Sequence, residues 1–183
     1  MLVIWILIII AALLIIIFIS YYNRFIVLGN RIDNSLSQIN VQLKRRADLI
    51  PNLVESVKGF AKHEKEAIKA VTDARKALVG AKGVVDKVKA DRTLESALGR
   101  LFAIAEGYPD LKANTNFLEL QRELASTEDK VAYSRQFYND SILSYNNMCQ
   151  KFPGNMFAGI YGKKTREYLQ ILESEKKLVK VEF

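Results

Sequence analysis

Residues 25–61 read FIVLGNRIDNSLSQINVQLKRRADLIPNLVESVKGFA. Apolar side chains recur in this stretch at steps of three and four residues, which is the repeat of one face of an α-helix. The apolar positions are Phe25, Leu28, Ile32, Leu36, Ile39, Leu43, Ala47, Ile50, Val54, Val57 and Ala61. The pattern predicts a long amphipathic helix whose apolar face packs against other parts of the chain.

Pro51 lies inside this apolar stripe. A proline in a helix interior removes one backbone hydrogen bond and clashes with the preceding turn, at a cost of about 3 kcal/mol. The stripe nevertheless keeps its phase on both sides of the proline. Two structures remain open: a kinked but continuous helix, or a break at which Asp48 caps a new helix with Pro51 in its first turn.

The stretch before this helix, residues 1–19, reads MLVIWILIIIAALLIIIFI and contains no charged side chain. As a helix it would be about 28 Å long, close to the ~30 Å hydrocarbon core of a bilayer. A basic leader and a small-residue cleavage pattern are both missing, so we expect residues 1–22 to be an uncleaved transmembrane signal anchor, with Trp5 and the pair Tyr21 and Tyr22 near the two interfaces. Arg24 and Arg31 follow the apolar run, so the positive-inside rule predicts an outside N-terminus and a cytoplasmic domain.

The remaining sequence also has helical spacing. Two glycines, Gly80 and Gly83, predict the turn of a helical hairpin, and Pro109 ends the second helix of that hairpin. Asn114, Thr115 and Asn116 offer N-caps for a long helix, and Asn116 with Glu119 resembles a capping box. Pro153 ends this long helix, and a charged helix is expected at 163–179.

The predicted fold class is therefore all-α. We expect the N-terminal transmembrane helix to be followed by an elongated antiparallel helical bundle over 23–160, with long coiled-coil-like helices of roughly 35 to 40 residues. Residues 161–183 would form a charged C-terminal helix or tail.

The cysteine and histidine counts and the net charge argue against several classes of function. One cysteine and one histidine are too few for a disulfide framework or a Cys/His zinc site, so we predict neither a metal nor another cofactor. The formal net charge is +7, which favours an anionic surface nearby, such as the cytoplasmic lipid leaflet. Acidic residues are interleaved with the basic ones, which argues against a nucleic-acid partner.

Three blocks of sequence occur together: QLKRRADLIPNLV at 42–54, EGYPDLKAN at 106–114, and the Tyr-Asn pairs at 138–139 and 145–146. Together they resemble the signature of the LemA family. The resemblance implies a bacterial inner-membrane protein with one span, a short extracellular N-terminus and a cytoplasmic bundle of antiparallel helices. It carries no catalytic residues over to this chain. After Gly159 the sequence departs from the aromatic-rich ending that is common in the family.

The densest run of cations consists of Lys44, Arg45 and Arg46. On a helix these three side chains spread over about 200°, so they cannot form a single phosphate clamp. Two roles remain open: an ion pair inside the protein, or contact with a lipid or a protein partner. The acids considered for such an ion pair are Asp48, Glu106 and Asp110.

Polar side chains inside the resembling blocks form a second candidate set. Buried Tyr and Asn fix helix register and cap helix ends through hydrogen bonds, and the same groups could instead line a ligand groove. The predicted structural polar network consists of Asp48, Asn52, Glu106, Tyr108, Asn114, Asn116, Tyr138, Asn139, Tyr145 and Asn146.

The sequence has no recognisable catalytic constellation. His63 and Glu64 do not form a zinc-protease motif, because Ala67 occupies the place of the second histidine. We therefore predict a non-catalytic, membrane-anchored cytoplasmic scaffold or adaptor with an unidentified protein partner. The alternative is a helical module that binds anionic lipid or remodels membranes. A homo-oligomer is compatible with either.

Overall fold

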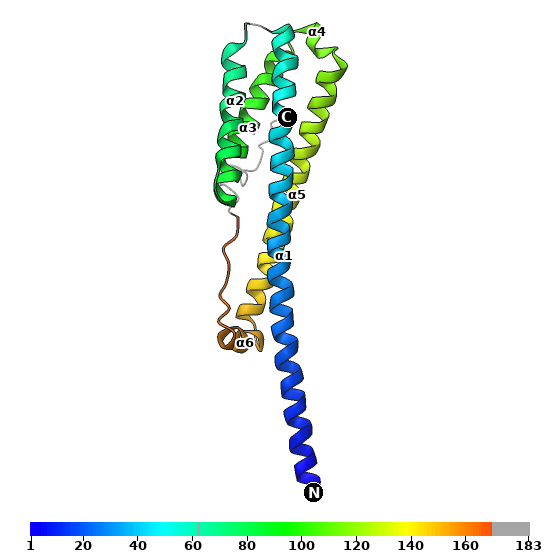
Figure 1. Ribbon diagram of the computed structural model, residues 1–183, viewed down its shortest axis with the longest axis vertical. Helices are drawn as coiled ribbons and strands as arrows, with labels where there is room; N and C mark the ends of the chain where they lie inside the picture. The colour runs from blue at the N-terminus through cyan, green and yellow to red at the C-terminus, as the bar shows by residue number, and fades with distance from the viewer. Residues whose placement is uncertain (62, 170–183) are drawn as a thin grey trace, which may run out of the picture. The chain divides into compact units, whose positions relative to one another are not determined.

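The computed structural model describes residues 1–61 and 63–169, and within them every regular element is a helix (Figure 1). The six helices are α1 (Leu2–Phe60), α2 (Lys65–Gly80), α3 (Val84–Ala105), α4 (Pro109–Lys112), α5 (Thr115–Gln150) and α6 (Gly154–Ile160). The predicted all-α class is confirmed. By their internal contacts the residues form two compact units: unit 1 is Met1–Ser35 with Gln136–Phe183, and unit 2 is Leu36–Arg135.

Unit 2 contains the predicted helical hairpin. Helices α2 and α3 pack against each other, and Gly83 turns the chain between them with a φ of 87°, which side chains larger than hydrogen disfavour. The core combines these helices with α4 and with the unit 2 segments of α1 and α5. Its most deeply buried apolar residues are Ile39, Ile50, Leu53, Val57, Val71, Leu94, Leu101, Leu111 and Leu124.

Helix α1 continues through Pro51 without a break, so the alternative of a second helix capped by Asp48 is not observed. A proline at position 51 has no N–H to donate to the carbonyl four residues earlier, which belongs to Ala47. Arg75 of α2 supplies the missing donor, because its Nε donates to the Ala47 oxygen at 2.8 Å. The guanidinium group therefore donates the hydrogen bond to the Ala47 carbonyl that the proline cannot donate.

Helix α5 begins with a side-chain cap at Asn114. The Asn114 Oδ1 accepts a hydrogen bond from the backbone N–H of Phe117 at 3.0 Å. This is one of the three predicted caps, whereas the expected capping box of Asn116 and Glu119 is not the observed arrangement. The reason is that Asn116 already lies inside the helix, one residue after its start at Thr115.

Unit 1 is built around a smaller core, in which Phe25 and Ile32 of α1 pack with Ile142, Tyr145 and Met148 of α5 and Ala158 of α6. Residues 163–169 follow α6 and are not helical, which corrects the prediction of a helix at 163–179. The rest of that predicted helix, 170–179, lies outside the described residues. Polar side chains of α5 bond the backbone of this segment instead, as described below.

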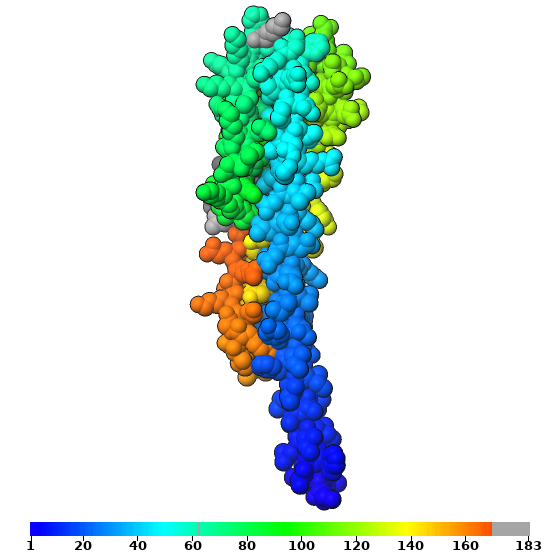
Figure 2. All heavy atoms as spheres, in the orientation of Figure 1, coloured from blue at the N-terminus to red at the C-terminus, as the bar shows by residue number. Residues whose placement is uncertain are grey.

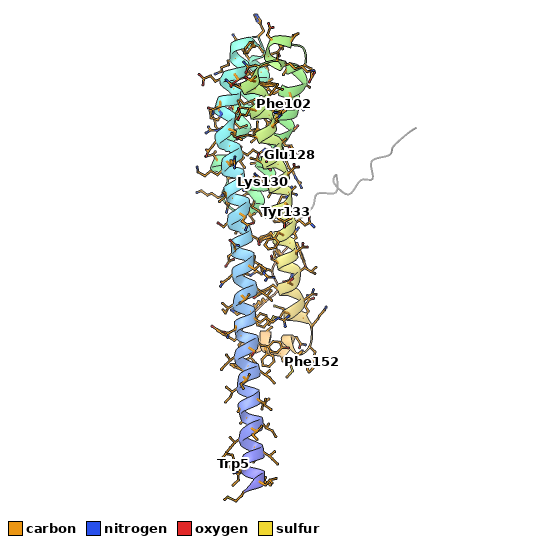
Figure 3. All side chains as sticks on the ribbon, turned by 90° about the vertical axis from the view of Figure 1, so that its right-hand side faces the viewer. Trp5, Phe102, Glu128, Lys130, Tyr133 and Phe152 are labelled. Carbon is orange, nitrogen blue, oxygen red and sulfur yellow. The ribbon has the colours of Figure 1, made fainter. Side chains whose placement is uncertain are left out.

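The apolar part of α1 is exposed along its whole length. The side chains of residues 2–19 are all exposed, that of Phe18 in spite of its ring contacts with α6. This helix is long and apolar enough to cross a membrane. In Figure 3, Trp5 lies on this exposed segment.

We predict that Arg75→Met destabilises the protein because it leaves the carbonyl of the buried residue Ala47 without a donor, at a cost of about 1–3 kcal/mol. In a Pro51→Ala background the new backbone N–H at position 51 takes over this carbonyl. The same Arg75→Met change should then cost much less. Urea unfolding of the four proteins in detergent, followed by far-ultraviolet circular dichroism, measures the double-mutant cycle. Equal costs in both backgrounds would contradict this account of how the proline is tolerated.

Candidate functional site

A buried ion cluster joins three helices of unit 2. Arg46 of α1 is only 2% exposed, and its two terminal nitrogens bond Asp91 of α3 at 3.1 Å and Glu128 of α5 at 3.3 Å. Asp91 is buried as well, whereas the Glu128 side chain is half-exposed at 50%. Figure 3 labels Glu128 on α5. Arg46 thus ties α1 to both α3 and α5.

Burial raises the pKa of the Asp91 carboxyl, and the adjacent Arg46 charge opposes that shift. Partial burial also raises the pKa of Glu128, and the nearby negative charge of Glu95 adds to this effect. The positive charge of Arg46 therefore favours ionisation of two carboxyl groups that their surroundings would otherwise neutralise. Removal of either side of such a buried pair leaves an uncompensated charge.

The other two cations of the predicted run lie at the surface. Lys44 pairs with Asp48 one turn along α1, with a nitrogen–oxygen distance of 2.9 Å. Arg45 lies 3.9 Å from Glu123 of α5. The structure therefore separates the run into one core residue and two exposed ones. Arg46 is buried and paired, so only Lys44 and Arg45 can meet a partner directly.

Sequence reasoning did not identify Asp91 as the partner of Arg46; it considered Asp48, Glu106 and Asp110. A signal was nevertheless present, because Asp91 falls at helical spacing between the apolar Val88 and Leu94 of α3. An acidic residue on a buried stripe, if ionised, favours a buried cation as its partner.

Several predicted polar residues make local pairs at the ends of the unit 2 helices. The Tyr108 hydroxyl donates to Glu64 Oε1 at 2.8 Å, and this bond raises the pKa of Tyr108. Glu106 forms an ion pair with Lys112 across the turn that contains α4. Together with the Asn114 cap, these contacts fix how the chain passes from α3 to α5.

In unit 1, Asn139 and Asn146 of α5 each hold the backbone of the segment after α6 by two hydrogen bonds. Asn139 donates to the Leu169 carbonyl at 3.1 Å and accepts from the Leu169 N–H at 2.9 Å. Asn146 makes the same pair of bonds with Arg166, both at 2.8 Å. Each amide thus satisfies one backbone donor and one acceptor, as a neighbouring β-strand would.

The spacing of these two asparagines matches the segment that they hold. Seven residues of α-helix rise about 10.5 Å, and three residues of extended chain cover about 10 Å. Arg166 adds two contacts, since its guanidinium lies 5.2 Å from the centre of the Tyr145 ring and 3.3 Å from Asp33 of α1. The Tyr-Asn pairs therefore contribute to the packing of this segment.

The side chains of Tyr138, Tyr145 and Cys149 are not activated as nucleophiles. Burial raises the pKa of the Tyr138 and Tyr145 hydroxyls and of the Cys149 thiol. A thiol of raised pKa is mostly protonated at neutral pH and is a poor nucleophile. Within residues 1–61 and 63–169, no group of three or more His, Cys, Asp or Glu side chains could hold a metal ion.

The α1–α5 groove is an open depression in unit 2 with a volume of about 500 Å³. Asn52 and Asn116 of the predicted network lie here rather than in a buried network. Carboxylates and two leucines surround them. The groove is lined by Leu49, Asn52, Glu55, Ser56, Asn116, Glu119, Leu120 and Glu123.

For the ion cluster we predict that Asp91→Leu costs about 3–5 kcal/mol of unfolding free energy, because it leaves Arg46 buried with one half-exposed partner. The double variant Arg46→Met with Asp91→Leu should be clearly more stable than Asp91→Leu alone. Chemical unfolding of the wild type, Asp91→Leu, Arg46→Met and the double variant checks this order and completes the cycle. Additive losses in the double variant would show that Arg46 and Asp91 are not coupled.

Comparison with known proteins places these features in a family. The model of the LemA family matches residues 35–183. Magnetosome protein MamQ 1 of Paramagnetospirillum magneticum is 28% identical over 175 residues, which cover 81% of this chain and 64% of that protein. Protein LemA of Metamycoplasma hominis is 30% identical over 132 residues, which cover 70% of this chain and 59% of that protein. This chain therefore spans less than two thirds of the length of the relatives that it matches. The agreement of the family model, which covers most of the sequence, with the helical fold and the apolar first helix shows that the chain belongs to the LemA family.

Proposed function

We propose that this protein is a membrane-anchored, non-catalytic helical adaptor. The observation that carries the proposal is the use of its polar groups. Arg46, Asp91, Tyr108, Asn139 and Asn146 all hold helices or backbone in place. An adaptor needs a rigid surface and a fixed location, and the helical units and the exposed apolar run of α1 support these two requirements.

We place the helical units on the cytoplasmic side of the membrane. Arg24 and Arg31 follow the apolar run closely, and Lys44 and Arg45 are exposed further along α1. Cations near a transmembrane segment favour the cytoplasmic side. In this arrangement residues 1–22 act as the anchor, and the N-terminus is outside.

The proposed contact surface for a protein partner is the α1–α5 groove of unit 2. It combines apolar patches from Leu49 and Leu120 with the carboxylates of Glu55, Glu119 and Glu123. Such a lining favours a partner segment that carries both apolar and basic side chains. Arg45 lies at the edge of the groove through its contact with Glu123, so changes of its charge should alter binding.

Site-specific photocrosslinking in native membranes tests the proposal. A photoreactive amino acid at Leu120, inside the groove, should give a crosslink to one defined protein. The same amino acid at Tyr133, which is exposed on α5 but outside the groove, should not give that product (Figure 3). Deletion of residues 1–20 should reduce the yield, because the anchor concentrates the chain at the membrane.

Charge reversal of Lys44 and Arg45 gives the second arm of this experiment. If the groove binds protein, the crosslinked product should change in yield while the bound lipid stays constant. Recovery of anionic lipid alone, lost on charge reversal, would overturn the adaptor proposal in favour of a lipid-binding module. An equal yield from Leu120 and Tyr133 would also contradict the groove as the contact surface.

A further inference from the structure

Helix α6 is fixed against the end of the apolar run of α1. The Phe157 ring stacks on Tyr21 with centroids 4.5 Å apart, and the Tyr161 ring meets Phe18 edge-to-face at 5.0 Å. The Tyr161 hydroxyl also donates to the Phe18 carbonyl oxygen at 2.6 Å. Figure 2 shows the atoms of this helix against α1. The contacts place α6 beside the residues at which the candidate span ends.

The start of α6 is also held tightly. A Cβ at Gly154 would collide with the backbone carbonyl oxygen of Met148, so only glycine allows the chain to lie this close to the end of α5. Gly154 and Ala158 are buried on the inner face of α6. The helix is therefore attached to the span on one face and to α5 at its start.

The opposite face of α6 is apolar and exposed. Phe152, just before the helix, is 80% exposed, and Met156 and Ile160 are 59% and 65% exposed. Met156 and Ile160 are four residues apart and so lie along one side of α6, whereas Phe152 precedes the helix. Figure 3 shows Phe152 pointing away from the packed helices of unit 1. With apolar residues on both faces and Asn155 as its single polar side chain, α6 does not resemble a water-solvated helix.

Charged residues flank this face rather than interrupt it. Lys151 precedes α6, Lys163 and Lys164 follow it, and Arg24 lies one turn after Tyr21 on α1. Apolar side chains with adjacent cations and tyrosines are typical of protein surfaces that lie in the headgroup layer of an anionic membrane. Helix α6 itself meets the exposed apolar run at Phe18, through the rings of Phe157 and Tyr161.

We propose that Phe152, Met156 and Ile160 insert into the interfacial layer of the bilayer that α1 spans. The inference rests on the proposed membrane span. In this arrangement α6 lies at the headgroup level, Tyr21, Tyr22 and Tyr161 form an aromatic belt, and Lys151, Lys163 and Lys164 contact lipid phosphates. Unit 1 is thereby attached to the membrane by a second element besides the span.

Tryptophan quenching by brominated lipids tests the membrane span of α1 and the interfacial position of α6 separately. This is possible because Trp5 is the sole tryptophan of the chain. The full-length protein is reconstituted into vesicles of phosphatidylcholine and phosphatidylglycerol. Bromine is carried on the acyl chains either close to the headgroup or near the bilayer centre. The wild type reports on the span through Trp5. The variant Trp5→Phe with Met156→Trp reports on α6.

We expect the fluorescence of the tryptophan introduced at Met156 to fall to half or less with bromines close to the headgroup. Bromines near the bilayer centre should quench it less. Trp5→Phe with Ile160→Trp should behave in the same way, which guards against a folding defect in one variant. The matched control is Trp5→Phe with Leu143→Trp, an exposed apolar position on α5 in the same unit, which should stay unquenched.

If Trp5 is quenched but the α6 reporters behave like the Leu143 control, the interfacial helix is wrong and the membrane span stands. If neither Trp5 nor the α6 reporters are quenched, the span and the inference fail together. Quenching of the α6 reporters and of the Leu143 control to the same degree would also overturn the inference.

Discussion

The hydrogen bond from Arg75 to the Ala47 carbonyl lets α1 remain one helix. Without it, Pro51 would leave the carbonyl of the buried residue Ala47 unpaired, and a bend or break would expose that group to water. A break would also disturb the apolar stripe, because residues on both sides of Pro51 belong to the same core. Arg75 of α2 thus replaces the hydrogen bond that Pro51 removes from α1. The continuity of α1 at the proline therefore depends on the packing of α2 against it.

In the ion cluster around Arg46, as at Ala47, a polar group on one helix is satisfied by side chains of other helices. A buried arginine contributes little net stability to a helical bundle, but it requires carboxylates at fixed positions. Because Asp91 and Glu128 come from different helices, the pairing favours one relative position of α1, α3 and α5. The asparagine pairs of unit 1 act similarly on an extended segment. Such groups specify a rigid surface rather than perform chemistry, which is why we favour an adaptor.

Helical periodicity and turn residues were sufficient to predict the all-α class, the hairpin turn at Gly80–Gly83 and the long helix that ends before Pro153. The cap of that helix was narrowed only to Asn114, Thr115 or Asn116, and the favoured capping box of Asn116 and Glu119 was wrong. These features depend on local residue preferences and on spacing along one element. The partners of Arg46, the donor for Ala47 and the segment held by Asn139 and Asn146 were not predicted, because each joins residues distant in sequence. The predicted helix at 163–179 was wrong over 163–169, where bonds from α5 override local helical spacing.

The membrane topology is the central claim of this account, and cysteine accessibility tests it most directly. A Cys149→Ser protein with a single new cysteine at Tyr133, an exposed position on α5, is treated with a membrane-impermeant maleimide. The account predicts labelling in inverted membrane vesicles and none in intact cells, whereas a cysteine at Leu2 should show the reverse pattern. Labelling of the Tyr133 position in intact cells would contradict the proposed cytoplasmic location of the helical units.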